Sequence, residues 1–156
     1  MHLSAMKTST ILLVLLFIGG QHARAVEPKV IILSCDGTVT DTSSTSLPID
    51  RQPKPVKKMG VVANLNERTV SFMGWVAPIN LLDAASIQFG GGEIGPGAQI
   101  AAKAGYTQRI DGILDRVTGH MEADTMTYET KKLSDLSSSI TKDHYDVLCK
   151  ATNRVF

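Results

Sequence analysis

Three side chains that can bind metal ions alternate along one short segment of the chain. His120, Glu122 and Asp124 occupy every second position, so on a β-strand they project from one face. One imidazole and two carboxylates on one face could ligate a divalent cation and support metal-assisted hydrolysis. Met121 and Ala123 take the intervening positions, which also describes a half-buried strand with a solvated face. The solvated face is the favoured interpretation, so we expect no metal ion or other cofactor.

A second histidine has carboxylates beside it nearer the C-terminus. Asp143 and Asp146 lie close to His144 in the sequence, and an acid–histidine pair can activate a serine nucleophile. That chemistry needs its serine on a sharp strand-to-helix elbow, and the sequence contains no G-x-S-x-G segment that would form one. We therefore interpret both His120 and His144 as parts of exposed polar strand faces.

Two further carboxylates, Asp111 and Asp115, could serve as the acid and base of glycoside hydrolysis. Residues 115–119 have the composition of a turn, in which an aspartate binds backbone N–H groups that follow it. We expect Asp115 to form that turn. Because the sequence holds no convergent catalytic set, it favours a protein that is not an enzyme.

Three other features could contact a ligand, but each has a simpler structural interpretation. Gly90–Gly97 lacks the Gly-Lys-Ser/Thr ending of a phosphate loop, which favours a flexible turn or a mobile lid. Residues 41–57 combine prolines with basic side chains and predict an exposed, solvated loop, although its charge could meet an acidic partner. Trp75, the single tryptophan, is expected to pack in the core.

The first 25 residues predict the compartment. Lys7 precedes a short apolar run over residues 11–18, and Ala23-Arg24-Ala25 follows as a cleavage signal, which is the layout of a secretory signal peptide. The run is shorter than the roughly 20 residues that span a bilayer, so we expect no membrane anchor after processing. We predict a periplasmic or secreted protein.

The predicted mature chain, residues 26–156, has nearly balanced charge. Removing Lys7 and Arg24 leaves 14 basic and 15 acidic side chains, a net charge of −1, whereas the full chain carries +1. A nucleic-acid partner is therefore not expected, because such proteins present an excess of basic side chains. The length of this segment predicts a single domain.

Both cysteines, Cys35 and Cys149, lie within the predicted mature chain. Two cysteines of an exported protein, without a C-x-x-C spacing, predict a structural disulfide rather than a redox-active pair. A disulfide places the two Cα atoms within about 7 Å of each other. The first and last ordered segments must then be neighbours.

The elements that must position these residues are predicted to be strands. Alternating or β-branched segments separated by turn signals indicate six or seven short antiparallel strands and one helical turn near residues 98–104. The predicted strands cover residues 30–35, 59–65, 69–75, 84–90, 110–114, 121–128 and 140–150. The first is predicted to end at a turn formed by Asp36 and Gly37. The fold class is an all-β meander, a small barrel or half-barrel, with a two-layer sandwich fitting almost as well.

Several short motifs resemble small exported proteins of alphaproteobacteria that have no assigned function. The resembling segments are Leu33-Ser34-Cys35-Asp36-Gly37-Thr38, Arg68-Thr69-Val70, the stretch 110–119, Leu148-Cys149-Lys150 and Arg154-Val155-Phe156. The resemblance implies export, β-structure and a disulfide, and it supplies no active-site residue.

The leading hypothesis is a non-enzymatic binding protein of the cell envelope, for example an inhibitor of a cell-envelope hydrolase. Its partner would be a protein or a small ligand. The alternatives are a metal-assisted hydrolase that uses His120, Glu122 and Asp124, and a small-ligand carrier with an open apolar barrel interior.

Overall fold

The computed structural model describes residues 30–43, 51–130 and 141–152. The predicted signal peptide, the middle of the predicted 41–57 loop and the C-terminal Arg154-Val155-Phe156 lie outside the described residues. The elements are β1 (Val30–Asp41), β2 (Lys54–Asn64), β3 (Thr69–Phe72), β4 (Trp75–Leu82), β5 (Ser86–Gly92), α1 (Pro96–Lys103), β6 (Tyr106–Asp115), β7 (His120–Glu129) and β8 (Thr141–Ala151). The described part of the chain has no helix that is long and apolar enough to cross a membrane.

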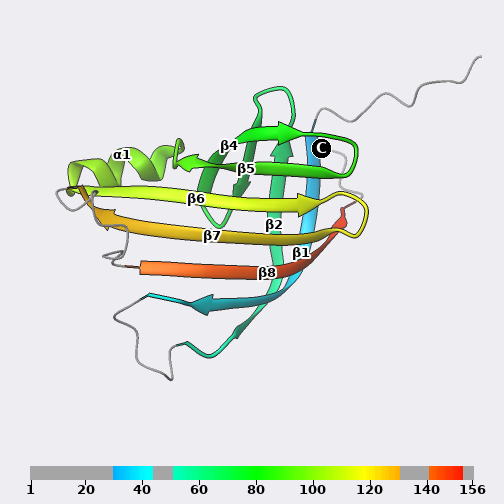
Figure 1. Ribbon diagram of the computed structural model, residues 1–156, viewed down its shortest axis with the longest axis horizontal. Coiled ribbons are helices and arrows are strands. Elements are labelled where there is room, and N and C mark those ends of the chain that lie inside the picture. The colour runs from blue at the N-terminus through cyan, green and yellow to red at the C-terminus, as the bar shows by residue number, and fades with distance from the viewer. Residues whose placement is uncertain (1–29, 44–50, 131–140, 153–156) are drawn as a thin grey trace, which may run out of the picture.

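The eight strands form one closed antiparallel barrel. Each strand pairs with the next in the sequence, and β8 returns to pair with β1. Figure 1 shows β5 to β8 running side by side, with α1 beside the start of β6. The predicted all-β meander is confirmed, and between the barrel and the sandwich the barrel is correct. Closure pairs the first and last strands, which removes the edges at which a flat sheet would aggregate.

Side-chain alternation decides which residues fill the barrel. On β7, Met121, Ala123 and Thr125 are buried, whereas Glu122 between them is exposed. The same alternation buries Tyr145, Val147 and Cys149 on β8, as the sequence predicts. The largest fully buried side chains are Ile87, Ile110, Met121, Val61, Val70 and Val147. Trp75 is partly buried and packs against this core, which agrees with its predicted role.

Aromatic side chains cross the interior. The ring of Phe72 lies 6.2 Å from that of Phe89 and 5.4 Å from that of Tyr145, both in edge-to-face geometry. Gly112 on β6 makes room for this packing, because a Cβ there would lie 2.5 Å from the Phe89 ring. The interior around these rings is therefore a packed core, as expected for a barrel of eight strands.

The strand count and the end of the first strand differ from the sequence prediction. β4 (Trp75–Leu82) is absent from it, so the barrel has eight strands rather than six or seven. Asp36 and Gly37 do not form a turn, because β1 continues through them to Asp41. Their register with β2 shifts instead, and Lys58, with φ of 53°, donates its backbone N–H to Asp36 Oδ1 at 2.9 Å. The aspartate thus stabilises a bulge within paired strands.

The glycine-rich segment is structured. Gly90, Gly91 and Gly92 belong to β5 and pair with β6, and Pro96 begins α1. The prediction of a flexible turn or lid over 90–97 is therefore wrong, while the predicted helical turn near 98–104 is confirmed as part of α1. The 41–57 prediction is also too long, because β2 begins at Lys54.

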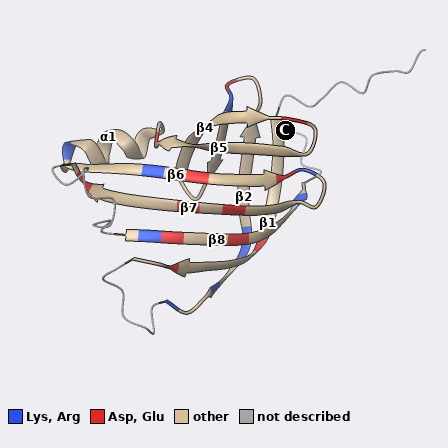
Figure 2. Ribbon diagram, in the orientation of Figure 1, with Lys and Arg blue, Asp and Glu red and all other residues tan. Residues whose placement is uncertain are grey.

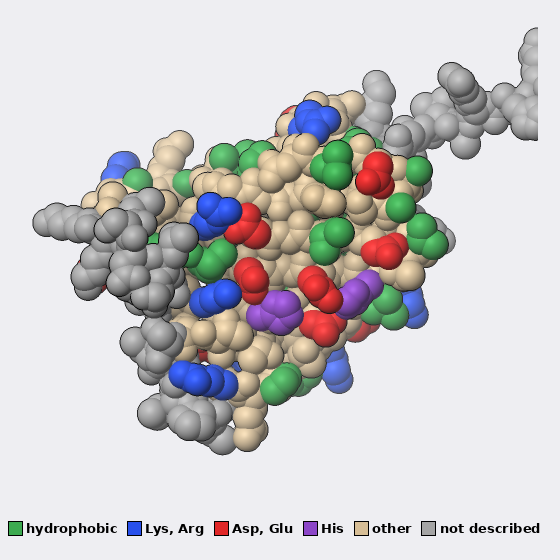
Figure 3. Space-filling model, in the orientation of Figure 1, with side chains coloured by type: hydrophobic (Ala, Val, Ile, Leu, Met, Phe, Trp, Pro, Cys, Tyr) green, Lys and Arg blue, Asp and Glu red, His purple; other side chains and the backbone are tan. Residues whose placement is uncertain are grey.

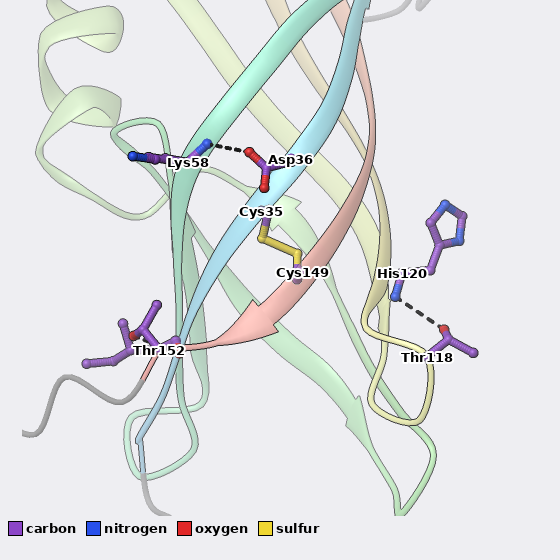
Figure 4. Close-up of a disulfide and its surroundings, with 8 residues drawn as sticks. Cys35, Asp36, Lys58, Thr118, His120, Cys149 and Thr152 are labelled. Carbon is purple, nitrogen blue, oxygen red and sulfur yellow. Dashed lines mark hydrogen bonds between the residues drawn. A yellow bond between two sulfur atoms is a disulfide. The ribbon is translucent and has the colours of Figure 1, made fainter.

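The disulfide lies at the seam where the barrel closes. Cys35 of β1 and Cys149 of β8 are direct cross-strand partners with Cα atoms 4.0 Å apart, and they are disulfide-bonded. Figure 4 shows the bond between the two strands, beside the Asp36–Lys58 contact. The predicted link between first and last strands is confirmed.

Candidate functional site

Acidic and histidine side chains lie on the outer face of β6, β7 and β8, in two rows that run across the strands. Antiparallel register places Asp111, Asp124 and His144 in one row. The neighbouring row contains Ile113, Glu122 and Asp146. Figure 2 shows acidic positions on all three adjacent strands. The barrel therefore brings together carboxylates that the sequence separates by up to 35 positions.

His120 pairs with Asp146 on the neighbouring strand β8. Its Nε2 donates to Asp146 Oδ1 at 2.8 Å, and its Nδ1 lies 3.9 Å from Glu122 Oε1. The hydrogen bond to Asp146 is the main reason that the pKa of His120 lies above its ordinary value. Burial has the next largest effect and lowers the pKa, while the charges of Asp146, Glu122 and Asp115 each raise it by a smaller amount.

His144 also pairs across strands rather than along the sequence. Its Nδ1 hydrogen-bonds Asp124 Oδ1 at 2.9 Å, and Lys142 Nζ lies 3.9 Å from Asp124 Oδ2. Asp143 is in register with Thr125, one of the inward-facing residues, and burial raises its pKa, with the nearby charge of Asp41 adding to the effect. Asp143, His144 and Asp146, which are neighbours in the sequence, therefore do not act as one group. His144 hydrogen-bonds Asp124 on β7, and Asp146 hydrogen-bonds His120 on β7.

The predicted metal trio is divided in the same way. His120, Glu122 and Asp124 do share the outer face of β7, as the alternation indicates. Their contacts, however, join His120 to Asp146 and Asp124 to His144. Among the described residues, no three histidine, cysteine or acidic side chains lie together in a way that could hold a metal ion.

Asp111 and Asp115 have separate structural contacts. Asp115 Oδ1 accepts hydrogen bonds from the backbone N–H groups of Val117 at 2.8 Å and Thr118 at 2.9 Å. These bonds, with that of Thr118 the largest contribution, lower the pKa of Asp115. The turn-forming role predicted for it is confirmed. Asp111 instead accepts from Arg109, whose Nε lies 2.6 Å from Oδ2.

A shallow hollow of about 430 Å³ lies on this face, over β5 to β8. Its polar lining consists of Gln88, Asp111, Glu122, Asp124 and His144. Gly112, Ile113 and Ala123 complete it, and Ile113 is 40% exposed. Figure 3 shows acidic and histidine side chains gathered on one face of the molecule. Sequence reasoning does not find the hollow, because it exists only once register aligns four strands.

This arrangement suits contact with a lysine or arginine side chain. Three carboxylates line the hollow: Asp111, Glu122 and Asp124. The side chain of Glu122 is 54% accessible, compared with 35% for that of Asp124. An exposed aliphatic side chain such as Ile113 offers a surface for the methylene stem of a lysine or arginine, while its charged end meets carboxylates.

Fold and site together describe a disulfide-closed, eight-stranded antiparallel barrel with a carboxylate- and histidine-bearing outer face. No family model matches the chain, and neither a curated protein nor a solved structure gives a significant match.

The His120–Asp146 pair makes one contribution to stability depend on pH. A histidine whose folded pKa is raised above the unfolded value of 6.5 stabilises the protein below that value and loses this effect as pH rises through the folded pKa. Asp146→Asn is therefore expected to lower the free energy of unfolding more at about pH 5.5 than at about pH 8.5. Because both side chains are substantially exposed, the loss at the lower pH is expected to be at most about 1 kcal/mol.

Urea unfolding at the two pH values measures this difference, and NMR titration of His120 reports its pKa directly. Glu67→Gln is the matched control, since Glu67 is an exposed carboxylate in the β2–β3 turn. An Asp146→Asn loss that is equal at both pH values would contradict the prediction.

Proposed function

We propose that this protein is an exported binding module that holds a basic protein of the cell envelope, such as a hydrolase that it inhibits, through the hollow on β5 to β8. The observation that carries the proposal is the 430 Å³ hollow lined by Asp111, Glu122 and Asp124. A lysine or arginine of the partner would enter it, with its stem against Ile113. The protein would act by occupying the partner's surface rather than by catalysis.

Of the three carboxylates that line the hollow, Glu122 is the one that a cation of the partner would meet. Asp111 is paired with Arg109, and Asp124 lies near Lys142. Glu122 is contacted by His120, whose Nδ1 is 3.9 Å away. A partner lysine beside Glu122 would gain a close carboxylate, and the attraction between the two charges would strengthen as the bound partner excludes water from the contact. Acidic faces also steer basic partners during encounter, which speeds association.

The predicted location is consistent with such a role. The Cys35–Cys149 disulfide is compatible with an oxidising compartment, outside the cytoplasm. The predicted signal peptide would deliver the chain to the periplasm or the medium.

Binding to a purified basic muramidase tests the proposal. We expect measurable affinity that falls as salt rises, because exposed charges are screened. In the double variant Glu122→Gln with Asp124→Asn, two of the three carboxylate charges that line the hollow are removed. At roughly 0.5–1 kcal/mol each, their loss is expected to weaken binding about fivefold to thirtyfold. Association rates measured by surface plasmon resonance should carry much of this change.

Two controls make the result specific. Glu67→Gln removes one carboxylate away from the hollow and is expected to leave affinity nearly unchanged. A neutral hydrolase of similar size should not bind. If the muramidase does not bind, or binds the double variant as tightly as the unmodified chain, the proposed function is wrong.

A further inference from the structure

A second pocket, which we name the mouth pocket, opens at the end of the barrel where β6 turns into β7. Its volume is about 340 Å³. Its walls are Ile31 and Leu33 of β1, Leu114 of β6, Cys149 and Ala151 of β8, and the β6–β7 turn 115–119. It is separate from the hollow, because the two sets of lining residues share no member.

The side chains from the strands make the mouth pocket apolar. Leu33, Leu114 and Cys149 are members of the buried core, and Ala151 is in register with Leu33 at the end of β8. These side chains continue the inner surface of the barrel up to its opening. Val117, at the tip of the turn, is 79% exposed and adds an apolar lip.

The polar groups of the turn are already engaged in holding it. Asp115 Oδ1 accepts the N–H groups of Val117 and Thr118. The Thr118 hydroxyl accepts from His120 N at 3.2 Å, as Figure 4 shows. Arg116 donates from its guanidinium to the carbonyl of Asp83 at 2.6 Å. A bound molecule would therefore contact mainly hydrocarbon, because the charged groups of the turn form hydrogen bonds within the protein itself.

The turn is also held against β8, so the pocket is formed in advance. Cys149 N donates to Gly119 O at 2.8 Å, and Gly119 N donates to Asp115 O at 2.9 Å. Gly119 has φ of 78°, and a Cβ at this position would lie 2.3 Å from Cys149 O. Glycine is needed for both reasons, and it lets the turn approach β8 closely enough to act as a fixed wall.

From this geometry we infer that the mouth pocket binds a small, uncharged, predominantly apolar molecule. Its volume is near the lower end of the roughly 300–1,000 Å³ typical of small-molecule sites, which matches a compact ring system better than a folded protein segment. The apolar walls favour an uncharged ligand, since a charged group would lose its hydration without a free partner. This site does not depend on the proposed function of the hollow.

The test uses N-phenyl-1-naphthylamine, an uncharged apolar probe whose fluorescence rises in apolar surroundings. We expect saturable binding to the full chain. Methyl resonances of Leu33, Leu114 and Val117 are expected to shift in NMR spectra as the probe is added. If the shifts instead fall on other methyl groups, or if no saturable binding occurs, the inference is overturned.

A filling variant and a matched control locate the site. Ala151→Trp places a large ring at the exposed edge of the pocket without altering the buried core, and it should weaken probe binding at least tenfold. Gln99→Trp adds the same side chain at an exposed position of α1, away from the pocket, and should leave binding unchanged. Equal affinity in both variants would overturn the inference.

A third variant distinguishes an external ligand from the chain itself. A chain that ends at Thr152 lacks the last four residues, which begin two positions after Ala151 at the end of β8. An affinity within about twofold of the full chain supports a site for an external molecule. Much tighter binding by the shortened chain would show that its own C-terminal residues occupy the pocket, and would overturn the inference.

Discussion

Replacing both cysteines with alanine is expected to lower the free energy of unfolding by about 4–5 kcal/mol. The residues are 114 positions apart in the sequence, so the bond removes a large amount of conformational freedom from the unfolded chain. This amount is comparable to the net stability of many small domains. The double variant Cys35→Ala with Cys149→Ala should therefore be only marginally folded at room temperature.

The position of the bond adds to this expectation. β1 and β8 pair from Leu33 opposite Ala151 to Asp41 opposite Asp143, and this pairing closes the barrel. Of all the strand pairs, it joins the segments farthest apart in sequence, which carry the highest entropic cost of contact. Without the disulfide, only the hydrogen bonds and packing between β1 and β8 offset this loss of conformational entropy.

Urea unfolding of the oxidised chain, the reduced chain and the alanine variant measures the effect. Alanine is preferred to serine here, because Cys35 is completely buried and a buried hydroxyl would add its own cost. Reduction should destabilise the unmodified chain and leave the alanine variant unaffected. A loss below about 1 kcal/mol would contradict the entropic argument.

Alternation along single strands was sufficient to predict which residues point inward. The pattern of Met121 and Ala123 against Glu122 identifies the buried and exposed faces of β7 correctly, and the same holds for β8. The two cysteines likewise predict that the first and last strands are neighbours, as the pairing of β1 with β8 confirms. These inferences succeed because the two-residue period of a strand is a local property.

The missed strand and the missed turn have identifiable physical causes. β4 contains Pro78 and a register shift between Ile79 and Leu81, and proline within a run argues against a strand. Asp36-Gly37 has the composition of a turn, yet the barrel uses it opposite a bulge on β2. In both places tertiary pairing outweighs the local preference of the sequence.

The candidate site could be predicted only in part, because no single segment of the sequence determines how neighbouring strands align. The sequence places His144 beside Asp143 and Asp146, but its carboxylate partner is Asp124 on β7. Likewise His120 bonds Asp146 on β8. Both contacts follow from the alignment of β7 with β8. Composition revealed the types of residue on the face, and only the barrel determines the pairs.

Phe72→Ala is expected to lower the free energy of unfolding by about 3–5 kcal/mol. Phe72 is 2% exposed and contacts both the Phe89 and Tyr145 rings. Its removal leaves a cavity bordered by two aromatic faces that lose their edge-to-face partner. Each such aromatic pair is worth about 0.5–1.5 kcal/mol beyond the area that it buries, so the loss should fall in the upper part of the range.

Urea unfolding measures this loss, with Tyr106→Ala as the control. Tyr106 is 38% exposed on β6, so truncating it should change stability by at most about 0.5 kcal/mol. An apolar cavity in a barrel that still folds should bind benzene, and saturating benzene should therefore raise the stability of Phe72→Ala by more than that of Tyr106→Ala, which has the mouth pocket but no new cavity. Such rescue would locate the packed interior at Phe72, apart from the mouth pocket. A loss below about 1 kcal/mol would mean that the aromatic residues are not the packed centre of the barrel.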